Sequence, residues 1–416
     1  MNPQDGRASL RFLTHSAFLL ALAFFLAITP MLVPHAGAQA VQAVSPEGED
    51  FSAEAALLYR VVACSGNAAL PANLNPQIVA KHCALLKPRM ERYRRRYLAR
   101  ARPFIAGILP HPIPDNVVYP FGGGDLLSAL TTYPDLRKVT TLSLELAGDP
   151  RRITTLDDKR LEDSLDFIDR NINSLLAANE STSKTLEATQ QGDLPGQLCF
   201  FLVGLAVHGY EPVSLRYFRM EPDGSLHYYA AEEVHTLESG LAQRRHGQWT
   251  PPDFSEAFAN SELVFRPLGS DGPLLIHRHI AANLRDDYLK KRSPVLLYLE
   301  SQGRVSAMTK AGSYCLWNPL FSRVRNYLLA NMEVMISDSS GIPPELARQA
   351  GFVQDTYGSF EGAMCFDSCP DDQYSDQFRD LWAGQPHRAL AFRYGYVDAK
   401  KSYHLMVTRR APQATP

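Results

Sequence analysis

The 416-residue sequence lacks several features that would place a chain in a functional class at once. Beyond about its first forty residues it has no apolar run that could cross a membrane, because Leu198–Val207 is half of the ~20 residues that a span needs. It has no excess of one charge, since 42 Lys and Arg stand against 44 Asp and Glu, and this balance gives no general affinity for nucleic acid. It has no internal repeat at a fixed period and no linker that demands two domains. Hydrophobic residues make up 45% of the chain, which is typical of a globular protein with an apolar core.

The first forty residues or so are typical of a secretory signal peptide. Arg7 and Arg11 supply a positive start, Ala17–Val33 is apolar and uncharged, and small residues offer a cleavage site after Ala38 or Ala40. An uncleaved membrane anchor is the alternative. No Cys near this region suggests lipidation, and no twin-arginine pair is present. We therefore expect a periplasmic or secreted protein with no stable membrane span after cleavage.

Export makes disulfides plausible, and Cys64 and Cys83 form the first expected pair. They fall in two successive helical patterns, residues 52–66 and 76–102, which a turn-rich segment joins. A bridge between them would staple this helical hairpin by closing a loop of about 20 residues.

Cys365 and Cys369 in "CFDSC" form the second expected pair. A C-x-x-x-C spacing can also hold a metal, but no His lies nearby, so we favour the disulfide. Cys199 and Cys315 lie in apolar surroundings that are typical of buried free thiols.

The pattern of the mature chain predicts a single α/β domain over residues 41–416, with a helical hairpin at 41–110, a core at 115–360, and a C-terminal helix and hairpin at 361–416. In the core, residues 116–145 predict a strand, a glycine turn, a helix that Asp125 caps, and a second strand. This sequence of elements predicts a parallel, Rossmann-like βαβ unit in a mixed sheet.

The remaining elements follow from the hydrophobic period. Alternating residues around "EPDG" and "GSDG" predict two hairpins, within residues 212–231 and 262–281. Further helices are predicted at 156–179, 198–207, 283–303, 319–331 and 375–384, and further strands at 304–309, 333–337 and 352–360. A last hairpin is predicted from residues 388–397 and 403–410.

The turn in "VVYPFGGGDLLSAL", residues 117–130, has the order of elements of a nucleotide-binding loop. Gly122 and Gly124 fit the first two glycine positions, but Leu127 stands at the third, and Asp125 would repel a phosphate. Glu145, at the end of the second strand, would suit a ribose hydroxyl. Over about 30 residues this segment resembles class I methyltransferases, whose ligand S-adenosylmethionine carries no phosphate. The alternative is a glycine turn that only a tight strand-to-helix junction requires, and the cofactor stays unassigned.

A second cluster, "TKAGSY" at residues 309–314, offers Lys310 as a base for Ser313, although the order S-x-x-K is missing. A third, "SDSSGIPPE", places Asp338, Ser339 and Ser340 after a predicted strand, where α/β sheets bind ligands. An Asx-turn followed by a helix cap at Ser340 explains the same residues structurally.

His277 and His279 would share one strand face and could ligate zinc, but no third ligand is evident, so we predict solvent-facing histidines and no metal site. The arginine-rich stretch at residues 89–102 could contact an anionic surface, but it is more simply a solvated helix face.

"YPFGGGDLL", "TKAGSY", "DSSGIPP" and "YGSF", in this order, resemble a family of uncharacterised exported bacterial proteins with Y-P-F-G-G-x-D, K-A-x-S-Y and D-x-S-G-I-P motifs. The resemblance covers Tyr119 to about Phe360. Gly124 stands where the family has Pro, and Gly312 where it has Ala. The resemblance implies relatives and no particular chemistry.

Three functions follow as expectations. The first is an exported ligand-binding or cell-envelope accessory protein with a small-molecule or envelope ligand. Its cleft would be lined by Tyr119, Gly122, Gly123, Gly124, Asp125, Glu145 and Ser340. The second is an envelope hydrolase or transferase that uses Lys310, Ser313 and Asp338. The third is a degenerate methyltransferase-like fold without activity.

Overall fold

The computed structural model describes residues 48–178, 193–194, 196–239, 255–312, 316–362, 373–396, 398, 400 and 402–411. The chain divides into two compact units, residues 1–43 and 44–416, and every described residue belongs to the second. The expected signal peptide, Ser313, and the expected Cys365–Cys369 pair lie outside the described residues, as does Cys315.

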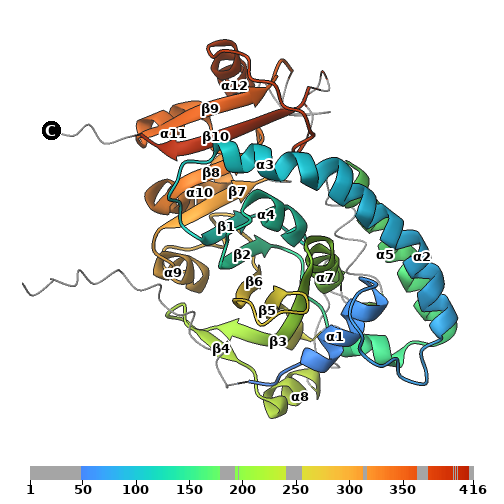
Figure 1. The fold of residues 1–416 in the computed structure, drawn as a ribbon. Helices are drawn as coiled ribbons and strands as arrows, with labels where there is room; N and C mark the ends of the chain where they lie inside the picture. Colours follow the sequence, from blue (N-terminus) through green and yellow to red (C-terminus); the bar gives the residue numbers. More distant parts are fainter. Residues whose placement is uncertain are drawn as a thin grey trace, which may run out of the picture. The chain divides into compact units, whose positions relative to one another are not determined.

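One mixed sheet organises the described residues, and its ten strands stand in the order β4-β3-β5-β6-β2-β1-β7-β8-β10-β9 (Figure 1). The five central strands, β6, β2, β1, β7 and β8, are mutually parallel, and the strands at either side pair antiparallel. The strands are β1 (Asn116–Pro120), β2 (Lys138–Ser143), β3 (Tyr210–Met220), β4 (Leu226–Tyr228), β5 (Asn260–Pro267), β6 (Leu275–Ala281), β7 (Val305–Thr309), β8 (Met332–Ser337), β9 (Phe352–Gly358) and β10 (His404–Arg410).

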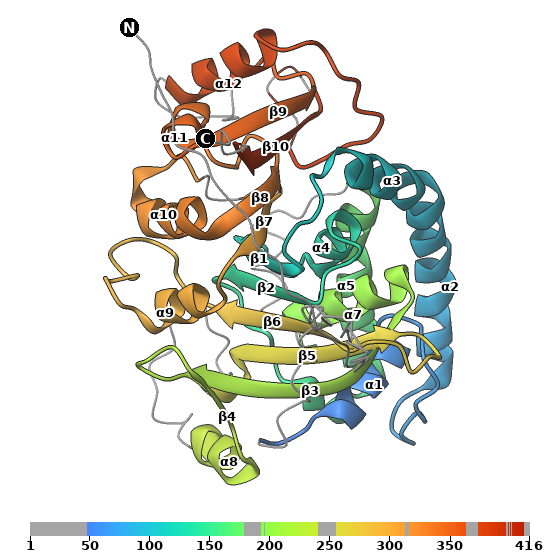
Figure 2. The same ribbon diagram turned by 60° about the vertical axis from the view of Figure 1, so that its left-hand side comes forward.

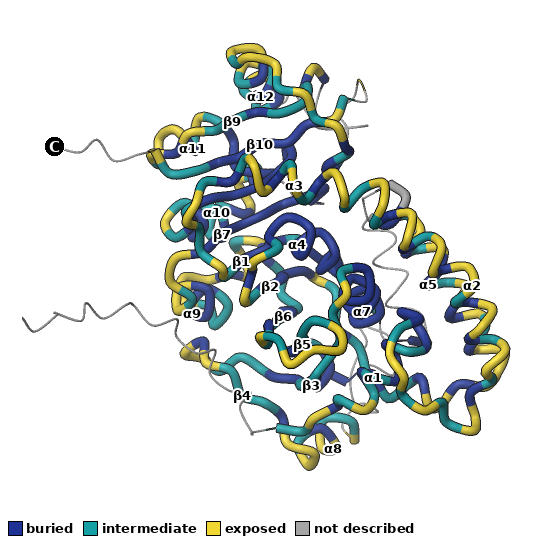
Figure 3. The backbone as a smooth tube through the Cα atoms, in the orientation of Figure 1, coloured by how far each residue is buried: buried dark blue, intermediate teal, exposed yellow. Residues whose placement is uncertain are grey.

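Helices cover both faces of the sheet, as the rotated view shows (Figure 2). On one face lie α1 (Ser52–Val61), α2 (Pro76–Tyr93), η1 (Arg94–Leu98), α3 (Ala99–Ile108), α4 (Leu126–Thr132), α5 (Asp158–Ala178) and α7 (Gly196–His208). On the other lie α9 (Pro294–Ser301), η5 (Pro319–Phe321), α10 (Ser322–Asn331) and α11 (Pro344–Gln349). The chain also forms η2 (Pro150–Thr155), α8 (Ala231–Ser239), η4 (Glu256–Phe258) and α12 (Gln373–Ala383). Strands β1, β7 and β8, together with α4 and α7, are the most continuously buried elements (Figure 3).

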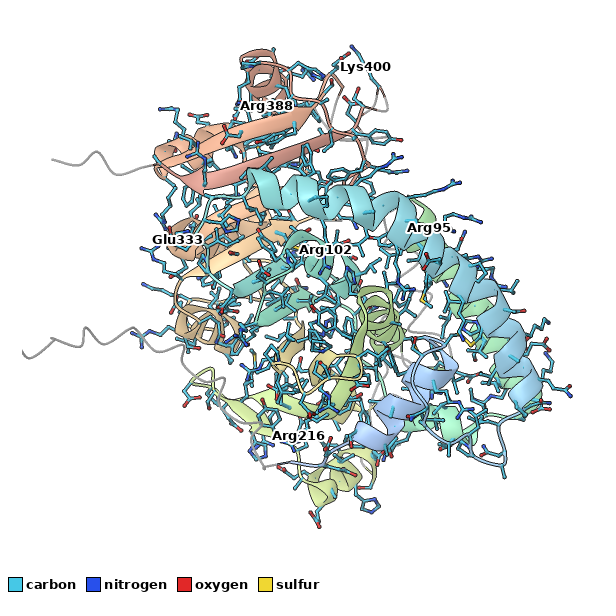
Figure 4. The ribbon with its side chains drawn as sticks, viewed as in Figure 1. Arg95, Arg102, Arg216, Glu333, Arg388 and Lys400 are labelled. Atoms are coloured by element: carbon cyan, nitrogen blue, oxygen red, sulfur yellow. A yellow bond between two sulfur atoms is a disulfide. The ribbon has the colours of Figure 1, made fainter. Side chains whose placement is uncertain are left out.

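The expected disulfide of the N-terminal helical segment is confirmed. Cys64 and Cys83 are bonded with their Cα atoms 5.4 Å apart. The expected packing of its two helices against each other as a hairpin is not seen, because α1 packs mainly on β3 and α7, whereas α2 packs mainly on α5. The second helix is longer than predicted, because α2, η1 and α3 continue one another to Ile108. Along it Arg95 lies on the outer side and is mostly exposed, as predicted for a solvated face, whereas Arg102 turns inward and donates to the Leu130 carbonyl at the end of α4 (Figure 4).

Most predicted elements are confirmed near their predicted bounds. The strands on either side of the glycine turn pair in parallel, and both hairpins with "EPDG" and "GSDG" turns are present. The prediction of one helix over residues 283–303 is wrong, because the helix begins only at Pro294, where Ser293 caps it. No described helix has both the length and the apolar composition to span a bilayer.

The predicted C-terminal hairpin is also wrong. Residues 388–396 form no strand, and β10 pairs instead with β8 and β9. The alternating apolar residues of this segment are buried for another reason, because Phe392 and Tyr394 pack into the core beside the parallel strands.

Candidate functional site

The carboxyl ends of β1 and β7 form the point at which ligand sites of open α/β sheets lie. From β1 the chain moves to β2 on one side, whereas β7 and β8 lie on the other, so the strand order reverses between β1 and β7. The sheet brings most predicted site residues to this edge. Tyr119 lies near the end of β1 and residues 122–125 follow that strand, Lys310 follows β7, and Asp338 and Ser340 follow β8.

Lys310 and Asp125 form a buried ion pair at this point. The Lys310 ammonium lies 2.9 Å from Asp125 Oδ2 and 2.5 Å from Ser128 Oγ. The Tyr119 hydroxyl donates to the same carboxylate oxygen at 3.2 Å, and the other oxygen accepts the Ser128 backbone N–H at 3.0 Å. The side chains of Lys310 and Asp125 are 1% and 5% exposed. Burial, and then the charge of Asp125, raise the pKa of Tyr119 well above its ordinary value, so it remains a phenol.

This arrangement does not fit the predicted role of Lys310 as the base for a nucleophilic serine. Its ammonium is committed to a carboxylate and a hydroxyl on α4 and the preceding turn, rather than lying free beside a nucleophile. An ammonium held in an ion pair cannot accept a proton from a serine. The predicted partner, Ser313, lies outside the described residues.

Asp338 joins three loops through its carboxylate. Oδ2 accepts the backbone N–H groups of Ala311 at 2.8 Å and Tyr396 at 3.1 Å, and Oδ1 accepts the Ser340 backbone N–H at 2.9 Å and the Ser340 hydroxyl. An ionised carboxylate offers about four acceptor sites, so these four donors fill it. The predicted Asx-turn is therefore present, but the predicted helix cap is not at Ser340, because α11 begins after Pro343.

The segment before β10 closes the space between these groups. Tyr394 is 1% exposed, and burial, followed by the charge of Asp338, raises its pKa well above the ordinary value, so it remains a phenol. Gly395, at φ +63°, packs so closely on Asp338 that any added Cβ would overlap the carboxylate. The chain's own residues therefore occupy the edge where we expected a ligand cleft.

The glycine turn contacts α7. A Cβ on Gly124 would overlap the Gln197 side chain and lie 3.0 Å from Phe200 Cβ, and one on Gly204 of α7 would lie 3.0 Å from the Leu127 nitrogen. Gly123 adopts φ +49°, which favours glycine. A Cβ on Gly122 would lie 2.9 Å from the Tyr119 ring. Each glycine thus has a reason in packing or backbone conformation.

His277 and His279 are buried, so the prediction of solvent-facing histidines is wrong. The Thr141 hydroxyl lies 2.9 Å from His277 Nε2 and 3.0 Å from His279 Nδ1, and His279 Nε2 donates to the Glu145 carbonyl at 2.7 Å. Burial lowers the pKa of His279 to about 4 and that of His277 well below its ordinary value, so both rings are neutral. The predicted ligand residue Glu145 thus contributes its backbone to a structural bond, while its side chain is half-buried.

A separate hollow of about 230 Å³ lies at the opposite edge, beside the amino ends of β1 and β2. Its wall is largely apolar, and the exposed residues Asp115 and Asp135 are among those that line it. The apolar lining comes from Ala106, Leu109, Ile113, Tyr133 and Leu136, with Pro112, Pro114 and Pro134. Nothing in the sequence singled out these residues, because prolines in a loop are first a sign of a turn.

Within the described ranges, no three His, Cys, Asp or Glu side chains gather closely enough to hold a metal ion. Comparison of the chain with protein-family models, with curated proteins and with solved structures finds no match.

Proposed function

We propose that this chain is an exported binding protein of the cell envelope, built on a methyltransferase-like sheet whose cofactor crevice is closed. The strand order supports the fold part of the proposal. Strands β1, β2, β6, β7 and β8 stand as the first five strands of doubly wound nucleotide-binding sheets do. The antiparallel β10 lies between β8 and β9, which resembles the reversed last strand of class I methyltransferases. Fold alone assigns no activity, so the function rests on the site.

The observation that carries the proposal is the closed crevice. A cofactor at the switch point would meet Gly395 and Tyr396 packed and bonded against Asp338, and Lys310 and Asp125 already bonded to each other. Separating a buried ion pair leaves an uncompensated charge and costs about 3–5 kcal/mol, which a ligand's binding energy would have to exceed. Methyl transfer from S-adenosylmethionine is therefore not the function that this edge supports.

Export is supported by the N-terminal sequence and by the Cys64–Cys83 disulfide, because disulfides persist in oxidising compartments. The membership in a family of exported bacterial proteins that the four motifs suggest agrees with this location. The contacts of Lys310 and Asp338 also argue against the hydrolase role predicted for these two residues, because Lys310 is bonded to Asp125 and Ser128 and four donors fill the Asp338 carboxylate.

The hollow at the amino edge is the ligand site that we assign to this function. Its volume of about 230 Å³ lies below the ~300–1,000 Å³ of typical ligand pockets, so the ligand is compact. Its apolar wall favours an apolar body, and Asp115 and Asp135 favour a cationic group on the ligand.

The test is native mass spectrometry of protein purified from the envelope fraction, followed by a thermal-shift panel of compact aromatic and aliphatic amines. We expect a bound amine to raise the melting temperature, and adenosine and S-adenosylmethionine to leave it unchanged. Ala106 lines the hollow, so Ala106→Phe should abolish the amine shift, whereas Ala99→Phe, on the exposed part of the same helix, should retain it. A shift with S-adenosylmethionine, or an amine shift that Ala106→Phe leaves intact, would contradict the proposal.

A further inference from the structure

Ser339 follows Asp338, whose carboxylate already accepts four hydrogen bonds. Unlike Ser340, Ser339 makes its side-chain contact with a histidine. Its hydroxyl lies 3.0 Å from His404 Nε2, and its backbone N–H donates to the same nitrogen at 3.1 Å. Because a nitrogen that accepts an N–H carries a lone pair, the ring proton of His404 lies on Nδ1. Nε2 therefore carries the ring's lone pair, and both the backbone N–H and the hydroxyl of Ser339 lie within hydrogen-bond distance of it.

The surroundings hold His404 in this orientation. The ring packs edge-on against Phe360, with centroids 5.0 Å apart, and against Trp382, with centroids 5.7 Å apart. Asp398 fixes the approach to β10, since it accepts four backbone N–H groups at 2.7–2.9 Å, from residues 361, 362, 400 and 402. His404 is fully buried, and burial lowers its pKa, so the ring is neutral. Ser339 is also buried, but it keeps 8% of its surface exposed, whereas His404 has none exposed.

Ser339 also lies between a strand and a helix, and α11 begins five residues after it, at Pro344. Residues 337–341 read Ser-Asp-Ser-Ser-Gly and follow β8 directly. A Cβ on Gly341 would overlap the Ser337 side chain, so the positions two before and two after Ser339 approach each other closely. The G-x-S-x-G turn of α/β-hydrolases needs small residues at these same two positions.

We propose that Ser339 is a nucleophile for acyl transfer from carboxylic esters, with His404 as its general base. Ser339 Oγ attacks the ester carbonyl carbon while its proton passes to His404 Nε2. The tetrahedral intermediate expels the alcohol, which takes that proton from Nε2, and an acyl-serine remains. Water then attacks the acyl-serine with the same base and releases the carboxylic acid.

The two contacts that Ser339 makes with His404 Nε2, through its N–H and its hydroxyl, have a consequence for the tetrahedral intermediate. Once Nε2 is protonated it no longer accepts, so the Ser339 backbone N–H is released as negative charge develops on the substrate oxygen. A nucleophile's own N–H is one of the donors that stabilise this charge in serine proteases. General-base assistance of this kind contributes about 10²- to 10⁴-fold to a rate. The site lies at the carboxyl edge, away from the proposed amine-binding hollow, and is independent of it.

The test is covalent labelling of the purified full chain with a fluorophosphonate, which phosphonylates an activated serine and releases fluoride. We expect a single adduct that peptide mapping places on Ser339. Ser339→Ala should abolish it, and Ser340→Ala, the matched control on the neighbouring serine, should retain it. His404→Gln keeps an acceptor for the Ser339 N–H but no basic nitrogen, and should slow labelling by about 100-fold or more.

Labelling at another residue, no labelling, or an unchanged rate in a folded His404→Gln would overturn the assignment. Because His404 is buried, that variant is first compared with the wild type by circular dichroism. If it does not fold, the decision rests on the mapped adduct and on Ser339→Ala, whose side chain contributes no buried apolar packing. Hydrolysis of p-nitrophenyl acetate that Ser339→Ala abolishes, and Ser340→Ala does not, supports the complete acyl-transfer cycle.

Discussion

Replacement of Lys310 by Met tests whether the Lys310–Asp125 pair is structural. Met has a similar length and no charge, so the change leaves the Asp125 carboxylate buried without its cation. Removing one partner of a buried pair costs about 3–5 kcal/mol. A domain is stable by only about 5–15 kcal/mol, so the loss would be a large part of the total. We expect a correspondingly large fall in the urea concentration at the midpoint of unfolding. Far-ultraviolet circular dichroism measures the unfolding.

Two further variants separate the ion pair from other effects. Asp125→Asn keeps an oxygen to cap α4 through the Ser128 N–H, but leaves the Lys310 ammonium unpaired, so its cost should be similar. The double variant removes both charges, and we expect it to be no less stable than either single variant, because buried pairs can be replaced by neutral groups at little cost. The exposed pair Lys81–Glu162 supplies the control, since its side chains are 61% and 44% exposed. The pair would not be structural if Lys310→Met lowered the free energy of unfolding no more than Lys81→Met does. It would also not be structural if the double variant lost as much free energy of unfolding as the two single variants together.

Three other predictions test the packing, the disulfide and the buried histidines. Gly124→Ala should destabilise the chain by about 1–3 kcal/mol, because the added methyl group overpacks against α7. Gly107→Ala, in a helix with open space around that position, should instead stabilise the chain by about 0.5–1 kcal/mol. Equal effects of the two variants in urea unfolding would refute the packing role of Gly124. Replacing both Cys64 and Cys83 by Ala should lower the free energy of unfolding by about 3 kcal/mol and make the urea midpoint insensitive to reductant. A urea midpoint equal to that of the oxidised wild type would show that the disulfide does not stabilise the chain. The pKa of His279 is about 4 in the folded chain against 6.5 for an ordinary histidine, so its contribution to stability is complete above pH 6.5 and is lost as pH falls toward 4. The free energy of unfolding should change by up to about 1.4 kcal/mol per pH unit in this range. His279→Gln should remove this part of the pH dependence measured by urea unfolding, and an unchanged pH dependence would count against a neutral, buried ring.

The fold near the glycine turn could be predicted because its signals are local. A buried apolar run, three glycines, a capping Asp and a second apolar run determine β1, α4 and β2 within a few residues of one another. The two hairpins were equally predictable, since "EPDG" and "GSDG" join strands that alternate in polarity.

The errors arose where burial has a tertiary cause. Phe392 and Tyr394 alternate as they would in a strand, but they are buried because their segment fills the carboxyl edge of the sheet. His277 and His279 were correctly placed on one strand face. Their polarity then suggested solvent, because the hydroxyl that contacts both rings, on Thr141, lies more than 130 residues away in sequence.

The candidate site was predictable in position and not in role. The predicted elements placed Asp125 after one strand and Asp338 after another, and in the structure Asp125 pairs with Lys310 while Asp338 accepts the neighbouring Ala311 N–H. Which atoms bond there depends on side chains that no local pattern announces, such as the Lys310–Asp125 contact across 185 residues. His404 escaped notice for the same reason, since its partner Ser339 lies 65 residues earlier.

The carboxyl edge therefore separates two kinds of polar residue that look alike in sequence. Asp338 and Ser340 are close to each other and to the strand ends, yet four donors fill the carboxylate and the Ser340 hydroxyl is one of them. A group whose hydrogen bonds are all satisfied within the chain holds the loops and has nothing left to offer a substrate. Ser339 is flanked by both, but its hydroxyl lies 3.0 Å from Nε2 of a neutral imidazole, and 8% of the residue's surface is exposed. The remaining bonding capacity of each residue, and not its position at the strand ends, decides which of them can do chemistry.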